Sequence, residues 1–182
     1  MATSYQSHSF FLEKDGQEES SFLEFLIRQA TQDEITQSKK SLLTTKDEDI
    51  ELKKLLLTGI LYLVRDPTNT QAHQTLVDTS FIKALLMFID PNSNQPSILR
   101  YQPAQLQELQ IHCLVLLSNI IPLIPEHFHQ INGHMILNQF LATYYDYDRR
   151  MACLKAICAT AQYDYFKKDY ADLNSGLVAN LI

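Results

Sequence analysis

Apolar side chains recur every three to four positions along most of this chain, and polar or proline-containing stretches separate the runs. Such spacing places the apolar residues on one face of an α-helix. The most regular run comprises Leu106, Leu109, Cys113, Leu116, Leu117 and Ile120. A similar set predicts the buried face of a helix over residues 50–65, namely Leu52, Leu55, Leu56, Ile60 and Leu63. We therefore predict an all-α chain with no β-sheet.

Capping residues, proline and glycine divide these runs into separate helices. Asp49 is expected to cap the helix over 50–65, and Asp66-Pro67 ends it, because proline disfavours helical geometry in the residue before it. Gly59 costs that helix about 1 kcal/mol relative to alanine, so we expect a close helix crossing at this position. Asp148 is expected to cap a later helix whose inward residues are Met151, Leu154, Ile157 and Cys158.

Short helices are predicted over residues 71–77, 126–131 and 163–170, and the helix that follows each begins in a similar way. These beginnings are Ser80-Phe81-Ile82, Gly133-His134-Met135 and Gly176-Leu177-Val178, with Ser21-Phe22-Leu23 as an upstream copy. Gly133 and Gly176 lie 43 positions apart, a spacing typical of armadillo and HEAT repeats. Repeats of this kind bury their apolar faces only by stacking. The sequence thus predicts an armadillo/HEAT-like, right-handed helical-repeat solenoid.

The predicted organisation begins with a polar, disordered segment over residues 1–20 and continues with repeats over 21–182. Residues 21–30 would end a first unit, with Ser21 and Glu24 forming a capping box, and residues 31–49 would be a linker. Further units are expected over 50–89, 104–145 and 148–182, with a loop of about fourteen residues between the first two of these. The last unit is expected to be open-ended and to present Leu177, Leu181 and Ile182 to following repeats or to a partner.

Charge and composition narrow the function classes. The net charge is −6, and residues 1–50 carry ten acids against five bases. Nucleic-acid binding needs a clustered basic face, so we expect none. The chain begins without a signal-peptide pattern and has no apolar run near the roughly 18 residues of a membrane span, so we expect no membrane association. The cysteines Cys113, Cys153 and Cys158 form no Cys-x-x-Cys pair. We expect them to be buried free thiols of a cytoplasmic or cytoskeletal protein.

Candidate chemistry is confined to three histidines. His127 and His129 form a His-x-His pair and His134 follows, a set that could bind zinc or copper if further ligands converged. The sequence places only Glu126 nearby, so we expect no metal and no cofactor. It contains no nucleophile motif or phosphate-binding glycine loop. We therefore expect no enzymatic activity and no small-molecule substrate.

The candidate interface is an aromatic and basic segment between two predicted units. It comprises Tyr144, Tyr145, Tyr147, Arg149 and Arg150. Tyrosine and arginine are frequent anchors of protein interfaces. The alternative is a loop whose tyrosines pack against neighbouring helices.

Two segments carry a resemblance to a known family. The first is Glu51-Leu52-Lys53-Lys54-Leu55-Leu56 with Arg65-Asp66-Pro67, and the second is Glu108-Leu109-Gln110-Ile111-His112 with Leu117-Ser118, Pro122-Leu123 and Gly133. Over residues 45–145 the chain resembles the armadillo-repeat core of the cilia- and flagella-associated protein 69 family. The resemblance implies a longer, non-enzymatic component of the motile cilium or flagellum, associated with the central apparatus of the axoneme, with other axonemal proteins as partners. It implies no catalytic or ligand residues.

Our leading hypothesis is therefore a structural scaffold whose faces bind other proteins of a large assembly. One alternative is a soluble armadillo-type adaptor that binds an extended peptide in a groove. Such grooves usually present tryptophan and asparagine ladders, whereas here tryptophan is absent and only Asn138 and Asn180 match. A second alternative, a metal-dependent enzyme, rests on the three histidines.

Overall fold

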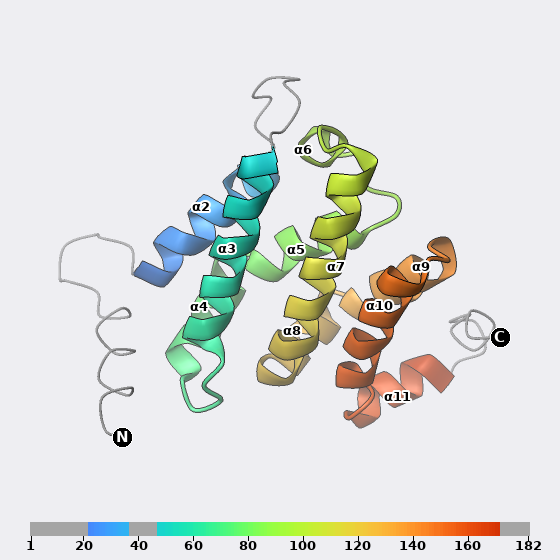
Figure 1. Ribbon diagram of the computed structural model, residues 1–182. Coiled ribbons are helices and arrows are strands. Elements are labelled where there is room, and N and C mark those ends of the chain that lie inside the picture. Colours follow the sequence, from blue (N-terminus) through green and yellow to red (C-terminus); the bar gives the residue numbers. More distant parts are fainter. Residues whose placement is uncertain (1–21, 37–46, 172–182) are drawn as a thin grey trace.

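The computed structural model describes residues 22–36 and 47–171, and every regular element in these ranges is a helix (Figure 1). The all-α prediction is confirmed there. The helices in order are α2 (Phe22–Thr36), α3 (Asp47–Val64), α4 (Thr70–Asp78), α5 (Phe81–Ile89), α6 (Pro96–Leu99), α7 (Pro103–Ile120), the 3-10 helix η1 (Ile121–Leu123), α8 (Pro125–Gln130), α9 (Gly133–Thr143), α10 (Tyr147–Thr160) and α11 (Asp164–Ala171).

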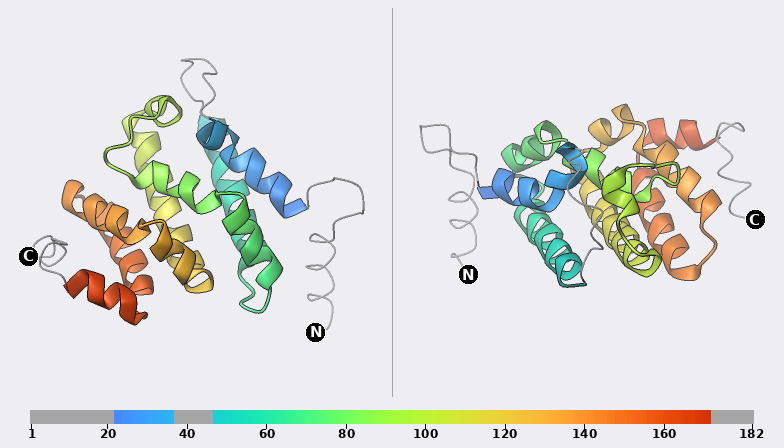
Figure 2. Two further views of the ribbon diagram at one scale, coloured as in Figure 1. Left: turned by 180° about the vertical axis from the view of Figure 1, so that it is seen from behind. Right: turned by 90° about the horizontal axis from the view of Figure 1, so that it is seen from above.

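The long helices α3, α7 and α10 lie side by side and run in the same direction (Figure 1). The shorter helices α5, α8 and α9 lie behind them and form a second layer (Figure 2, left). Helix α7 is central, since it packs against α3, α5 and α10. One apolar core runs through the array and includes Leu57, Phe81, Leu117, Phe140 and Phe166. The predicted helical-repeat solenoid is thus confirmed.

The succession of helices α3–α4–α5 recurs as α7–α8–α9, and one backbone feature shows which residues of the two groups are equivalent. Ser80, before α5, and Asn132, before α9, both adopt a left-handed conformation with φ of 56°. Non-glycine residues rarely adopt this conformation, so its recurrence identifies equivalent turns. Ser80 therefore matches Asn132, and the sequence comparison that placed Ser80 opposite Gly133 is wrong by one position.

Helix α3 buries only part of the predicted face: Ile60 is fully buried and Leu56 and Leu63 are partly buried. Leu52 and Leu55 are 56% and 70% exposed, and the buried residues are Ile50, Leu57, Ile60 and Val64. The helix carries leucine on several sides, so its apolar spacing does not select one face. It also begins at Asp47, which places Asp49 inside the first turn rather than at the cap.

Gly59 does not mark a close helix crossing. A Cβ added there would meet no atom within 4 Å among the described residues. The predicted reason for this glycine is therefore wrong, and nothing in the structure explains the residue.

Helix α10 begins one residue before the predicted cap, and Asp146 is the capping residue. Its side chain accepts a hydrogen bond from the Arg149 amide at 3.1 Å. The inward face carries mainly Ala152, Cys153, Ala156 and Ile157, whereas Met151 and Cys158 are exposed. Small side chains let α10 approach α7 closely, so the larger apolar residues are not the best guide to the buried face.

Two further boundaries differ from expectation. Helix α2 continues past Ala30 to Thr36, into the segment predicted as a linker. The loop between α5 and α7 contains one helical turn, α6, with Pro96 at its start. The predicted capping residue Ser21 lies outside the described residues.

One stretch of the described chain, Pro103–Leu123, is long and apolar enough to cross a bilayer by length and composition. The sequence prediction that no segment reaches this length is therefore wrong. The stretch contains α7, whose buried residues Leu109, Cys113, Leu114, Leu116, Leu117 and Ile120 contact α3, α5 and α10. Its apolar composition is accounted for by its central position in the core.

Candidate functional site

The predicted tyrosine–arginine segment joins α9 to α10, and the structure divides its members into two groups. Tyr144 and Arg149 face inward: the Arg149 guanidinium lies 4.1 Å from the centre of the Tyr144 ring. Arg149 also donates to the Asp146 carboxylate and, at 3.1 Å, to the Gln110 side-chain oxygen. Tyr144 and Arg149 therefore pack against neighbouring helices, which was the alternative to an interface role for this segment.

Gln110 of α7 is the buried centre of this network, and it was not among the residues predicted from the sequence. Its amide nitrogen donates to the Phe88 carbonyl at 3.1 Å and to the Tyr144 hydroxyl at 3.3 Å. A buried amide is costly unless its hydrogen bonds are made. Gln110 therefore ties α5, α7 and the α9–α10 junction together. The available signal was its position four residues after Leu106 and three before Cys113, at helical spacing with the predicted buried run.

Tyr145 and Tyr147 are the accessible members of the segment. They are 81% and 73% exposed, and the Arg150 guanidinium lies 5.9 Å from the centre of the Tyr145 ring. Arg150 is itself half-buried and donates to the Leu141 carbonyl at 3.3 Å. Large aromatic groups with so much free surface can contact a partner without rearrangement of the core.

Other exposed apolar residues lie apart from these tyrosines. Leu52 and Leu55 belong to α3 and Leu99 ends α6, and all three are exposed. In Figure 1, α3 and α10 lie on opposite sides of α7. We call the exposed pair Tyr145 and Tyr147 the apolar edge. Single exposed apolar residues are ordinary, whereas two large aromatic groups exposed two positions apart favour an interaction surface.

The histidines are arranged differently from the prediction. His129 of α8 and His134 of α9 have stacked rings with centres 5.3 Å apart, and Asp169 of α11 reaches both. Its Oδ2 lies 2.7 Å from His129 Nε2 and 3.3 Å from His134 Nε2. The premise that no carboxylate converges on the histidines is therefore wrong. Asp169 is distant in the sequence and lies on another helix. The spacing of the histidines alone therefore could not predict that its carboxylate lies beside them.

His134 is the buried member of this trio. Burial lowers its pKa, while the Asp169 carboxylate acts in the opposite direction. Nδ1 of His134 has no hydrogen-bond partner within the described residues. His127 takes no part in the trio, and burial likewise lowers its pKa.

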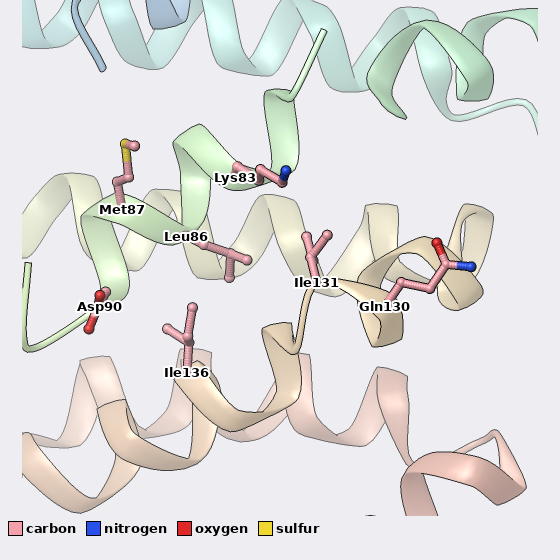
Figure 3. Close-up of a pocket in the computed structure, with 7 residues that line it drawn as sticks. All are labelled: Lys83, Leu86, Met87, Asp90, Gln130, Ile131 and Ile136. Carbon is pink, nitrogen blue, oxygen red and sulfur yellow. The ribbon is translucent and has the colours of Figure 1, made fainter. Parts of the chain in front are cut away.

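A hollow of about 360 Å³ lies between α5 and the α8–α9 turn (Figure 3). Leu86, Ile131 and Ile136 form its apolar centre, Asp90 and Gln130 lie at opposite ends, and Lys83 lies above the centre (Figure 3). Asn138 is buried and does not line the hollow. The asparagine ladder expected of a peptide groove is thus not formed at this position, and Asn180 lies outside the described residues.

The predicted interface residues Leu177, Leu181 and Ile182 also lie outside the described residues. The structure therefore does not test the expectation that the last unit presents an apolar stripe.

Two layers of stacked three-helix groups, with an exposed edge and a hollow between groups, define an armadillo-type helical-repeat protein. The family model described as "Cilia- and flagella-associated protein 69, ARM repeat" matches residues 13–168. The chain belongs to this family.

Curated relatives agree with this membership. The chain is 34% identical over 99 residues to cilia- and flagella-associated protein 69 of Homo sapiens, and 34% identical over 94 residues to that of Mus musculus. It is 35% identical over 100 residues to the protein of Callithrix jacchus. These alignments cover 54%, 52% and 54% of this chain and about a tenth of each relative. The chain therefore corresponds to a small part of the relatives it matches.

Proposed function

We propose that this protein is a non-enzymatic structural scaffold of the motile cilium or flagellum, built into the central apparatus of the axoneme. Family membership supports the ciliary setting, because the curated relatives are named for cilia and flagella. Stacked helical repeats support the scaffold role, since they present extended surfaces to other proteins. On this proposal the partners are other axonemal proteins and the protein belongs to the cytoskeleton.

The observation that carries the scaffold role is the apolar edge. Its two tyrosines project from the α9–α10 junction, which the Gln110 network holds in place. Tyrosine side chains have only two rotatable angles and so lose little conformational entropy on binding, which favours their use as anchors. We propose Tyr145 and Tyr147, with the adjacent Arg150, as the contact to a neighbouring protein.

The proposal is tested with the tagged chain expressed in ciliated cells that lack the endogenous protein. Axonemes are isolated, membranes are removed with detergent, and the chain is quantified in the axonemal and soluble fractions. The wild-type chain should remain with the axonemes. The double variant Tyr145→Ser/Tyr147→Ser should move to the soluble fraction, because two contact residues are lost while the core is unchanged.

The matched control is Tyr62→Ser. Tyr62 is also an exposed tyrosine, but it lies near the end of α3, away from the apolar edge. This variant should remain with the axonemes as the wild type does. A wild-type chain found only in the soluble fraction would contradict the ciliary scaffold, and equal retention of the double variant would contradict the tyrosine contact.

A second candidate is a cytoplasmic adaptor that binds a partner segment in the hollow between α5 and α9. The observation in its favour is the apolar centre flanked by Lys83 and Asp90. Ile136→Glu would place a charge in that centre and leave the apolar edge intact. If partners captured from ciliated cells were lost with Ile136→Glu and kept with the double tyrosine variant, the adaptor function would be favoured over the scaffold.

A further inference from the structure

Three potential metal ligands converge where α8, α9 and α11 meet. His129, His134 and Asp169 each offer one ligand atom, and these atoms all lie within 4.8 Å of one another. A tetrahedral zinc site with bond lengths of about 2.0–2.1 Å places its ligand atoms about 3.3 Å apart. The observed separations from Asp169 Oδ2, 2.7 and 3.3 Å, are close to this value, and the two histidine nitrogens lie within 4.8 Å of one another.

The ligand types indicate which class of ion would bind. Two imidazole nitrogens with one carboxylate oxygen suit zinc and similar first-row divalent ions, whereas calcium and magnesium prefer sets of oxygen ligands. Three protein ligands also leave one position open for water.

The surroundings hold the ligands in place. The His129 ring contacts Tyr165 and Phe166 edge-on, with ring centres 4.9 and 5.1 Å apart. The His134 ring contacts Phe166 and Tyr170 in the same way, at 5.4 and 6.1 Å. His134 is buried, while His129 and Asp169 keep about a third of their side-chain surface exposed. An ion can therefore enter from the His129–Asp169 side. The two imidazole planes are nearly parallel, at 12° to one another, so one ring must tilt for both Nε2 atoms to point at the same ion.

We propose that His129, His134 and Asp169 bind one zinc-class divalent ion, which fastens α11 to the α8–α9 pair. The ion would cross-link two successive helix groups of the array, because Asp169 belongs to the group that starts with α10. Metal that binds the folded but not the unfolded chain adds its binding free energy to stability. Zinc would thus control how firmly the last described helix is held.

The test uses the full 182-residue chain without a polyhistidine tag. Zinc is titrated against a chromophoric zinc chelator, which reports affinity and stoichiometry, and thermal unfolding is followed with and without zinc. One equivalent should bind tightly enough to compete with the chelator and should raise the unfolding temperature. Magnesium and calcium should do neither.

Two variants remove one ligand each, His129→Gln and Asp169→Asn, and circular dichroism checks that each remains helical. Each should weaken zinc binding by at least the roughly tenfold that loss of even an outer-shell partner costs. His127→Gln is the matched control: it lies on the same helix, with intermediate exposure, outside the trio. The control should bind zinc as the wild type does.

Three results would overturn the proposal. The first is a wild-type chain that binds no stoichiometric zinc. The second is unchanged affinity in both ligand variants, which would place the zinc elsewhere. The third is an equal loss of affinity in His127→Gln.

Discussion

Phe128 occupies the space that a side chain at position 133 would need. A Cβ built on Gly133 would lie 2.4 Å from two carbons of the Phe128 ring, closer than real Cβ atoms approach. The equivalent pair in the preceding group, aligned through Ser80 and Asn132, is Leu76 and Phe81, both fully buried. In the first group the smaller residue, Leu76, lies on the short helix α4, and the larger residue, Phe81, lies on α5. In the second group the sizes are reversed, with Phe128 on the short helix α8 and Gly133 on α9.

We predict that Gly133→Ala destabilises the protein by about 1–3 kcal/mol, the usual cost of overpacking a core. Phe128→Leu in the same chain should relieve part of that cost, because it restores the size order of the Leu76–Phe81 pair. A double-mutant cycle from denaturant unfolding should show a coupling of at least about 0.5 kcal/mol. Additive effects of the two substitutions would show that the residues do not share this space.

Neighbouring leucines in α3 should differ sharply in their contribution to stability. Leu57 is fully buried and Leu55 is exposed, so Leu57→Ala should cost about 2–5 kcal/mol. Leu55→Ala should change the free energy of unfolding by no more than about 0.5 kcal/mol. Urea unfolding of the two variants measures both. A larger loss of stability for Leu55→Ala would show that Leu55 faces the core, as the sequence pattern predicted.

Leu116 belongs to the predicted buried face of α7, and the structure confirms that its side chain is buried. It is buried in α7, the helix at the centre of the array. Leu116→Ala should therefore cost about 2–5 kcal/mol. Val115, its exposed neighbour on the same helix, provides the control. Val115→Ala should have little effect in the same unfolding experiment, and similar losses for both would contradict the described orientation of α7.

The three cysteines should differ in how readily a thiol reagent modifies them. Cys158 is exposed, whereas Cys113 and Cys153 are buried. Burial also raises the pKa of Cys153 to about 12, so this thiol stays protonated at pH 8, and the thiolate is the reactive form. A thiol reagent at pH 8 should modify Cys158 in the native protein and the other two only after unfolding. Mass spectrometry of peptides identifies the sites, and rapid labelling of Cys153 would contradict its position.

The order of the helices could be predicted well from the sequence because its signals are local. Prolines and the turns at Ser80 and Asn132 divide the chain wherever they occur, so α4, α5, α8 and α9 were located closely. The buried face of α7 was also identified, with Leu106 only partly buried, because its apolar spacing is regular.

The buried faces of α3 and α10 could not be predicted in this way. Leucine occurs on several sides of α3, and α10 packs through alanines that carry little hydrophobic signal. Which face is buried is decided by neighbouring helices, and those contacts are long-range.

The residues that complete the Gln110 network and the His129–His134–Asp169 trio also could not be predicted from sequence spacing. Gln110 and Asp169 each act on residues from other helices, 34 or more positions away for the Gln110–Tyr144 and His129–Asp169 contacts. Sequence spacing identified the tyrosines and histidines as candidates. It could not show that Tyr144 and Arg149 face inward, or that a carboxylate reaches His129 and His134.

The central proposal is that this chain belongs to the central apparatus of the ciliary axoneme. Cryo-electron tomography of axonemes from cells with and without the protein tests it most directly. We predict that averaged volumes from cells without the protein lack a discrete density on the central apparatus, and that the tagged chain restores it with label at that position. Identical central-apparatus volumes in the two kinds of cell would contradict the account.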